Sequence, residues 1–272
     1  MDFLHTTSQS DLGVFALGLV IAGAVGGLAA GVLGIGAGIV IVPVLYHVMA
    51  ALGIGTGVRM HIAIATSLAA MIPAALTQAQ NAKSEIQWDH VRIEGPPLLL
   101  GVAIGSAGAA MVNGSVLAVI FAVVAIPVVI YFAYGRPNSA AGNPGGAILL
   151  PFITGLASAL TGIAADTIRR CIHRLLKADL ERKRATVSVL AVFAAAAGAL
   201  AYGIAGWNTP DLPPDSLGYV NLIGFALIAP VMVAAEPAGA ALGHMMDLRR
   251  LRLVFAALVV VATARMLWDA FT

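Results

Sequence analysis

Five glycines interrupt the apolar segment at residues 27–46, and they constrain the fold more than any other feature of the chain. A glycine inside a helix costs about 1 kcal/mol relative to alanine, so a cluster of them predicts a break between two short apolar helices. Backbone at membrane depth leaves the helix only where protein or trapped water satisfies its polar groups. The segment therefore predicts a broken helix beside a buried path, a feature common in secondary transporters. The five glycines are Gly27, Gly31, Gly34, Gly36 and Gly38.

A weaker copy of this pattern occurs 128 positions further along the chain. Two related segments, each with a break, indicate two structural repeats, which we place at about residues 12–134 and 146–271. Only short loops separate the apolar runs, so the whole chain, residues 1–272, is expected to form a single transmembrane domain. The matched positions are Gly27 with Gly155, Ala30 with Ser158, Gly34 with Gly162 and Ile35 with Ile163.

The composition excludes an ordinary soluble domain, in which about a quarter of the residues are charged. Here 60% of the residues are hydrophobic, 10% are charged, and the mean hydropathy is +0.95. A membrane span needs about 20 apolar residues, and runs near that length recur along the chain. We therefore expect an all-α polytopic protein of the inner (plasma) membrane, with about eight to ten membrane helical segments. The runs are 12–33, 61–79, 95–112, 115–134, 146–163, 184–205, 219–243 and 251–271, with a marginal one at 36–53.

The positions of the basic residues predict the orientation in the membrane. Seven of the fifteen Lys and Arg residues lie between residues 169 and 184, whereas the loop 206–218 has none. Because cytoplasmic loops are enriched in Lys and Arg, the first segment is expected inside and the second outside. For residues 1–145 two orientations remain. The favoured one makes the two repeats inverted and places thirteen of the fifteen basic residues inside, while the alternative places eleven there and makes 164–181 an ordinary surface helix.

The first half contains the stretch Gly-Val-Leu-Gly-Ile-Gly-Ala-Gly-Ile-Val-Ile-Val-Pro-Val-Leu at residues 31–45, followed by Ala65-Thr66-Ser67. This pattern resembles the sulfite exporter TauE/SafE family, and the resemblance extends over nearly the whole chain. It implies a membrane permease that exports sulfite or small organosulfur anions such as sulfoacetate. The second half departs from the family pattern, because Gly-Ile-Gly-Gly-Gly and a later valine-proline are replaced by Gly162-Ile163-Ala164-Ala165-Asp166. This departure leaves the substrate open.

Compact anions such as sulfite are strongly hydrated, so a path through the membrane must replace their water with hydrogen-bond donors. The N-terminus of a half-helix supplies unpaired N–H groups and the positive end of the helix dipole. We therefore predict a substrate site at Gly-broken, re-entrant helix hairpins, with hydroxyl donors on the following helix. The alternative is structural, since small residues pack membrane helices and Ser and Thr bond back to carbonyls one turn earlier. The predicted residues are Gly34, Gly36, Ala37, Gly38, Thr66 and Ser67 in the first half and Thr161, Gly162, Thr186 and Ser188 in the second.

The stretch Asp166–Arg184 is amphipathic at helical spacing, with charged residues on one face and Ile and Leu on the other. One interpretation is an interfacial helix whose arginines reach anionic lipid headgroups. The other is a re-entrant helix that brings Arg169 or Arg170 to the substrate, because the planar guanidinium suits a sulfonate or carboxylate. Asp166 would hold that arginine in place. Glu236 lies inside a predicted span, so Glu236 and Asp166 are candidates for proton coupling or gating, and Glu236 is alternatively a buried structural partner.

We thus expect a secondary carrier or facilitator that moves a small sulfur-containing anion through a central site between the repeats. No cofactor, metal or nucleic acid is expected as a partner; membrane lipid surrounds the protein, and assembly into homo-oligomers stays open. The alternative is a permease for another small anion or for a metal or other cation, supported only by Glu236. An enzyme is not expected, because the six histidines are scattered without ligand spacing and Ser67 has no histidine at a useful helical spacing.

Overall fold

The computed structural model describes residues 9–34, 36–134, 148–175, 184–210, 212–213, 215–245 and 248–271. Within these ranges the fold is built from α-helices, with a 3₁₀ turn, η1 (Lys83–Glu85), and a short antiparallel strand pair, β1 (Ser216–Leu217) and β2 (Val220–Asn221). The helices are α2 (Gln9–Leu33), α3 (Gly38–Ala51), α4 (Thr56–Asn81), α5 (Trp88–Ala110), α6 (Gly114–Tyr134), α7 (Leu149–Thr161), α8 (Ala165–Leu175), α9 (Arg184–Ala205), α10 (Leu222–Met245) and α11 (Leu248–Phe271).

Six of the described helices, α4, α5, α6, α9, α10 and α11, are long and apolar enough to cross a membrane. By contrast α3, α7 and α8 contain 14, 13 and 11 residues and are too short to cross alone. Large apolar side chains face outwards from the long helices; Val123 is 66% exposed, Ile204 75% and Val261 67%. Such a surface is stable in lipid and not in water. The predicted all-α polytopic membrane fold is therefore confirmed.

Two helix breaks lie inside the bundle. The first separates α2 from α3, and the second separates α7 from α8. Gly34 in the first break has φ +62°, and Gly162 in the second has φ +68°. Side chains other than glycine rarely adopt such angles, so glycine at these two positions allows the chain to turn. The glycine-rich segments interrupt the helices as predicted, and the re-entrant placement of each hairpin in the membrane stays a prediction.

Glycines allow two pairs of helices, α2 with α10 and α5 with α7, to pack backbone against backbone. A Cβ on any of these glycines would collide with a main-chain atom of the partner helix. Small residues have this role in many membrane helix interfaces. Residue numbers rise together along both helices of each pair, so paired helices run in the same direction. The contacts are Gly27 with Met232, Gly31 with Glu236, Gly101 with Phe152 and Gly105 with Leu156.

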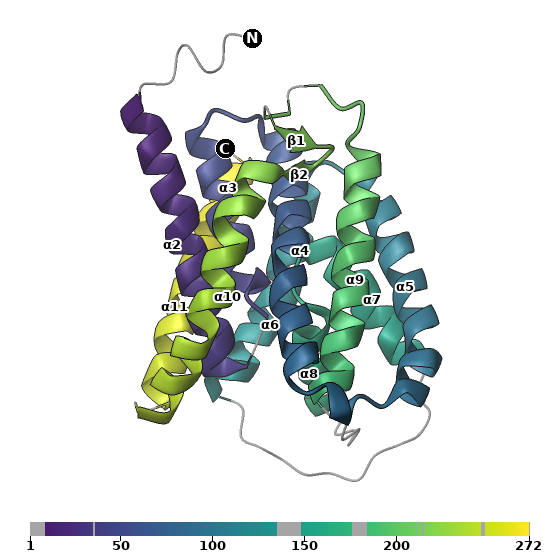
Figure 1. Ribbon diagram of the computed structural model, residues 1–272. Helices are drawn as coiled ribbons and strands as arrows, with labels where there is room; N and C mark the ends of the chain where they lie inside the picture. The colour runs from purple at the N-terminus through teal and green to yellow at the C-terminus, as the bar shows by residue number, and fades with distance from the viewer. Residues whose placement is uncertain are drawn as a thin grey trace.

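The two halves of the chain pack on each other reciprocally. In Figure 1, α9 leads to the end of the bundle that carries β1 and β2, whereas the neighbouring helix α4 ends at the opposite end. Helix α2 of the first half packs on α10 of the second, and α7 of the second half packs on α5 of the first. Such an exchange is the arrangement that two inverted repeats would produce. The repeat bounds and their inverted orientation in the membrane stay predictions.

Among the helices that begin away from the predicted spans, α5 and α10 show the physical cause. Helix α5 begins at Trp88 instead of residue 95, and it includes the charged Glu94, which is tolerated because it pairs with Arg169. The run predicted at 219–243 begins in the β2 region, and α10 starts only at Leu222. The backbone N–H of Asn221 donates there to a side chain of α4. Hydropathy along the chain misses both boundaries because each depends on a contact with the other half.

We expect Gly101→Leu to disrupt the α5–α7 interface, because the added side chain would collide with the main chain of Phe152. Overpacking of this kind costs about 1–3 kcal/mol, and more where the backbone cannot yield. Thermal unfolding of the purified protein should show a clearly lower midpoint. The control is Gly108→Leu on the same helix, where nothing lies within 4 Å of the Cβ position. Equal stability of the two variants would contradict the close packing of α5 on α7.

Candidate functional site

The two breaks lie against each other in the bundle. A Cβ on Gly38 would collide with the carbonyl oxygen of Gly162, and a Cβ on Gly36 would collide with the side chain of Ala164. Ser67 on α4 donates a hydrogen bond from Oγ to the Gly162 carbonyl at 3.1 Å. The glycines at the breaks therefore serve close packing, as the structural interpretation of the glycine cluster expects.

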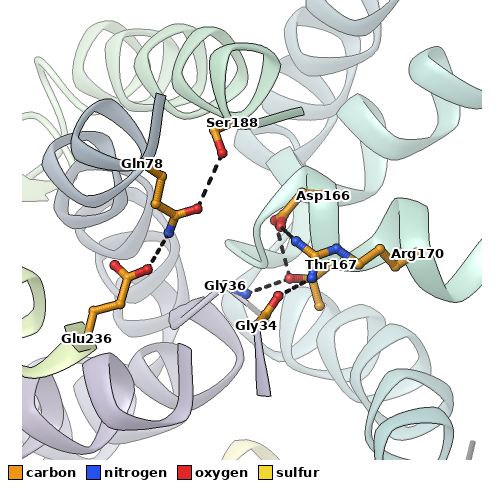
Figure 2. A network of polar contacts seen from close by, with 8 residues as sticks. All are labelled: Gly34, Gly36, Gln78, Asp166, Thr167, Arg170, Ser188 and Glu236. Carbon is orange, nitrogen blue, oxygen red and sulfur yellow. Dashed lines mark hydrogen bonds and ion pairs between the residues drawn. The ribbon is translucent and has the colours of Figure 1, made fainter. Parts of the chain in front are cut away.

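Helix α8 holds the first break in shape through side-chain contacts (Figure 2). The Arg170 guanidinium donates to the Gly34 carbonyl, just after α2, and to the Asp166 carboxylate at 2.5 Å. The Thr167 hydroxyl accepts a hydrogen bond from the Gly36 N–H at 2.7 Å. These charges also suit the helix dipoles, because the guanidinium lies at the C-terminal end of α2 and the carboxylate in the first turn of α8.

A pocket of about 640 Å³, counting the space open to solvent, lies beside the two breaks. Small residues of both breaks form one wall, and apolar and polar side chains of α4, α9 and α10 form the others. The breaks contribute Gly34, Gly36, Ala37, Ala164 and Ala165, and the polar side chains of the lining are Gln78, Ser158, Asp166, Ser188 and Glu236.

A chain of hydrogen bonds links α9, α4 and α10 at the pocket wall. Ser188 Oγ donates to Gln78 Oε1 at 3.3 Å, and Gln78 Nε2 donates to Glu236 Oε1 at 2.7 Å. Figure 2 shows these three side chains on one side of the view and the pair Asp166–Arg170 on the other. Glu236 therefore lies at the pocket wall, and its coupling or gating role stays a prediction.

Arg169 forms a buried, two-pronged ion pair with Glu94 on α5. The distances are 2.5 Å from Nη1 to Oε2 and 3.2 Å from Nη2 to Oε1, and the two side chains are only 8% and 2% exposed. The described residues that line the pocket do not include Arg169. Its neighbours Ile168 and Cys171 are buried as well. Arg169 thus fastens α8 to α5, and the described part of α8 packs inside the bundle.

Thr66 and Thr186 occupy corresponding places in the two halves. Thr66 Oγ1 accepts the N–H of Asn221 at 3.0 Å, directly before α10, and Thr186 Oγ1 accepts the N–H of Gln87 at 2.9 Å, directly before α5. The first N–H groups of a helix have no partner within the helix, so each threonine satisfies one near the start of a helix in the opposite half. This contact gives both hydroxyls a structural role.

Some of the predicted site residues line the pocket, and the others lie outside its lining. Gly38, Gly162 and Ser67 form the contact between the breaks, as described above. Thr161 bonds back to the carbonyl of Ala157 at 2.7 Å, one turn earlier, in the way the structural alternative expects. The predicted residues that line the pocket are Gly34, Gly36, Ala37, Asp166, Ser188 and Glu236.

Three residues that contact the breaks, the pocket or the charged side chains lie outside the predicted set. Each is a polar residue in or beside an apolar helix, which is the only signal that the sequence offers. That signal is weak, because membrane helices also carry polar residues that bond to their own backbone, as Thr77 does with the Pro73 carbonyl. The three are Glu94, Ser158 and Thr167.

Comparisons with known proteins agree with the membrane fold. The sequence model of the family described as "Sulfite exporter TauE/SafE" matches residues 19–266. A protein of Haemophilus influenzae described as "Probable membrane transporter protein" is 24% identical over 258 residues, which cover 93% of this chain and 98% of that protein. No solved structure matches the chain.

We expect Arg169→Met to destabilise the protein strongly, because it leaves the Glu94 carboxylate buried without its partner. Removing one member of a buried ion pair costs about 3–5 kcal/mol. The double variant Glu94→Gln/Arg169→Met should recover most of that loss, since no buried charge remains. Arg170→Met, whose side chain is 34% exposed, is the control and should be milder. Thermal unfolding compares the three variants with the wild-type protein. Equal losses of stability in Arg169→Met and in the double variant would contradict the role of the pair.

Proposed function

The chain belongs to the sulfite exporter TauE/SafE family, and we propose that it exports sulfite or a small organosulfonate, such as sulfoacetate, through the pocket beside its two helix breaks. The family match and the six apolar helices make it a multi-pass membrane transporter. The plasma membrane is the location typical of the family. The substrate, the direction of transport and the role of each pocket residue belong to the proposal.

The N-terminus of α3 at the pocket wall is the observation that carries the proposal. Gly36 and Ala37 line the pocket immediately before Gly38, the first residue of α3, and no side chain caps this helix end. First-turn N–H groups and the positive end of the helix dipole attract anions. The small side chains also let a sulfite or sulfonate oxygen approach the backbone closely. This end of α3 therefore supports an anion in the pocket.

The opposite wall adds neutral polar groups that suit the same ligand. The hydrogen bond from Ser188 to Gln78 is 3.3 Å long, near the outer limit for such a bond. A ligand oxygen that replaced it would therefore cost the protein little. The Ser188 hydroxyl and the Gln78 amide would then donate to an anion held against the start of α3.

The charges of two carboxylates in the pocket lining determine how strongly the pocket repels an anion. Asp166 is paired with Arg170, so its charge is compensated within the protein. Glu236 accepts a hydrogen bond from Gln78. Like charges repel strongly where little water lies between them. We therefore infer that Glu236 carries a proton while the anion is bound, which couples transport of the anion to transport of a proton.

The Glu236 carboxylate also supports a second candidate, a permease for a cation. That function would need Glu236 charged during transport, whereas the anion needs it neutral. Among the described residues, no three His, Cys, Asp or Glu side chains gather as ligands of a metal ion would. The anion proposal is preferred because α3 turns its positive end towards the pocket.

We expect sulfite or a sulfonate to raise the thermal unfolding midpoint of the purified protein, because a ligand that binds only the folded state stabilises it. The panel contains sulfite, sulfoacetate, taurine, sulfate, acetate and a divalent metal. Ala75→Phe should abolish the shift by filling the pocket. Leu76→Phe, at a neighbouring side chain that is 41% exposed, is the matched control and should keep the shift. Stabilisation by the metal alone would contradict the anion proposal and favour the cation permease.

We expect Glu236→Gln to bind an alkyl sulfonate more tightly than the wild-type protein at neutral pH, because the amide does not repel the anion. Wild-type binding should improve as the pH falls, since protonation of Glu236 removes the same charge, whereas the variant should bind equally across this range. Ligand-induced shifts of the unfolding midpoint at several pH values measure both effects. Ser188→Ala is the control and should keep the pH dependence. A variant that binds more weakly and remains pH-dependent would contradict the coupling role.

A further inference from the structure

Arg252 lines a crevice separate from the pocket beside the helix breaks. Arg252 lies in the second turn of α11, and its Nε atom is buried with no hydrogen-bond partner among the described residues. The crevice has a volume of about 310 Å³, counting the open space, and residues of α2, α3, α6 and α11 form its walls. A buried arginine nitrogen without a hydrogen bond in a membrane helix is costly, so an anionic partner is expected at this position.

The surrounding helices supply no such counter-ion. The described sequences of α2, α3, α6 and α11 contain only two acidic residues, Asp11 and Asp269, and each lies near the end of its helix that is far from the crevice. Arg252 is the charged residue among the described residues that line the crevice, so the crevice is positively charged there and complementary to an anion.

The remaining walls of the crevice are apolar. They offer no donors that would replace the water around a free inorganic anion, but they suit a hydrocarbon chain. The apolar surface continues outwards on the same helices, since Ile130 of α6 is 54% exposed and Val254 of α11 is 64% exposed. The wall residues next to Arg252 include Phe132, Phe255 and Val259.

We propose that this crevice binds an anionic phospholipid, with the phosphate paired to Arg252 and the beginning of an acyl chain against Phe132 and Phe255. Arg252 lies four residues after the start of α11, about 6 Å along the helix at the usual rise, which places it near a headgroup boundary. Because cytoplasmic segments are enriched in Lys and Arg, the sequence positions Arg249, Arg250 and Arg252 predict that this end of α11 lies on the cytoplasmic side. Basic pockets between transmembrane helices on that side bind anionic headgroups.

The test titrates the purified, delipidated full-length protein with phosphatidylglycerol or phosphatidylcholine that carry the same acyl chains. Phosphatidylglycerol should raise the thermal unfolding midpoint more than phosphatidylcholine does. Arg252→Gln should weaken the apparent affinity for phosphatidylglycerol roughly tenfold, which corresponds to about 1.4 kcal/mol. Arg265→Gln removes an exposed charge near the other end of the same helix and should leave the affinity unchanged. Equal losses in the two variants would show that only net charge matters and would overturn the proposal.

Three further measurements separate a lipid site from a structural arginine and from a free-phosphate site. Without lipid, Arg252→Gln should be at least as stable as the wild-type protein, because no internal partner loses its contact; lower stability would overturn the proposal. Ala256→Phe fills the crevice while keeping Arg252 and should also remove the preference for phosphatidylglycerol. Glycerol phosphate, a headgroup without acyl chains, should not stabilise the protein, and protection equal to that of the lipid would identify a free-phosphate site instead.

Discussion

The rest of the structure depends on satisfying the backbone polar groups that two helix breaks leave inside an apolar bundle. Membrane interiors supply no bulk water for these groups, so the protein must supply the partners. The Gly34 carbonyl accepts from Arg170, and the Gly36 N–H donates to Thr167, both on α8. The Gly162 carbonyl accepts from α4. Each break is thus stabilised by a helix outside its own hairpin, and neither would be stable as an isolated segment.

Charge inside the bundle follows the same rule, because a buried charge needs a partner within the protein. Helix α8 carries the charged face of the second half. Its Arg169 forms an ion pair with Glu94 on α5, and its Arg170 forms one with Asp166. These contacts place α8 against the breaks instead of along the surface of the bundle. The two halves therefore differ in chemistry. The first break is made of small residues, whereas the second is followed by the amphipathic helix α8, whose side chains bond to the first break.

This asymmetry shapes the pocket. The first half contributes an uncapped helix end with small residues, and the second contributes Asp166 with its arginine, Ser188 and Glu236. A ligand in the pocket would touch both halves at once, so a relative movement of the halves would change its surroundings. This placement suits a transporter, in which a site between two packed halves is exposed to either side of the membrane in turn.

The sequence by itself determined the membrane fold and the breaks, because hydropathy and the glycines Gly34 and Gly162 act through local properties of the chain. It also pointed to Glu236, since a charged residue in an apolar span is conspicuous. Only the tertiary structure decided the partners, such as Gln78 for Glu236 and Glu94 for one of the two adjacent arginines. Those choices depend on distances between helices far apart in the chain, and local pattern carries no information about such distances.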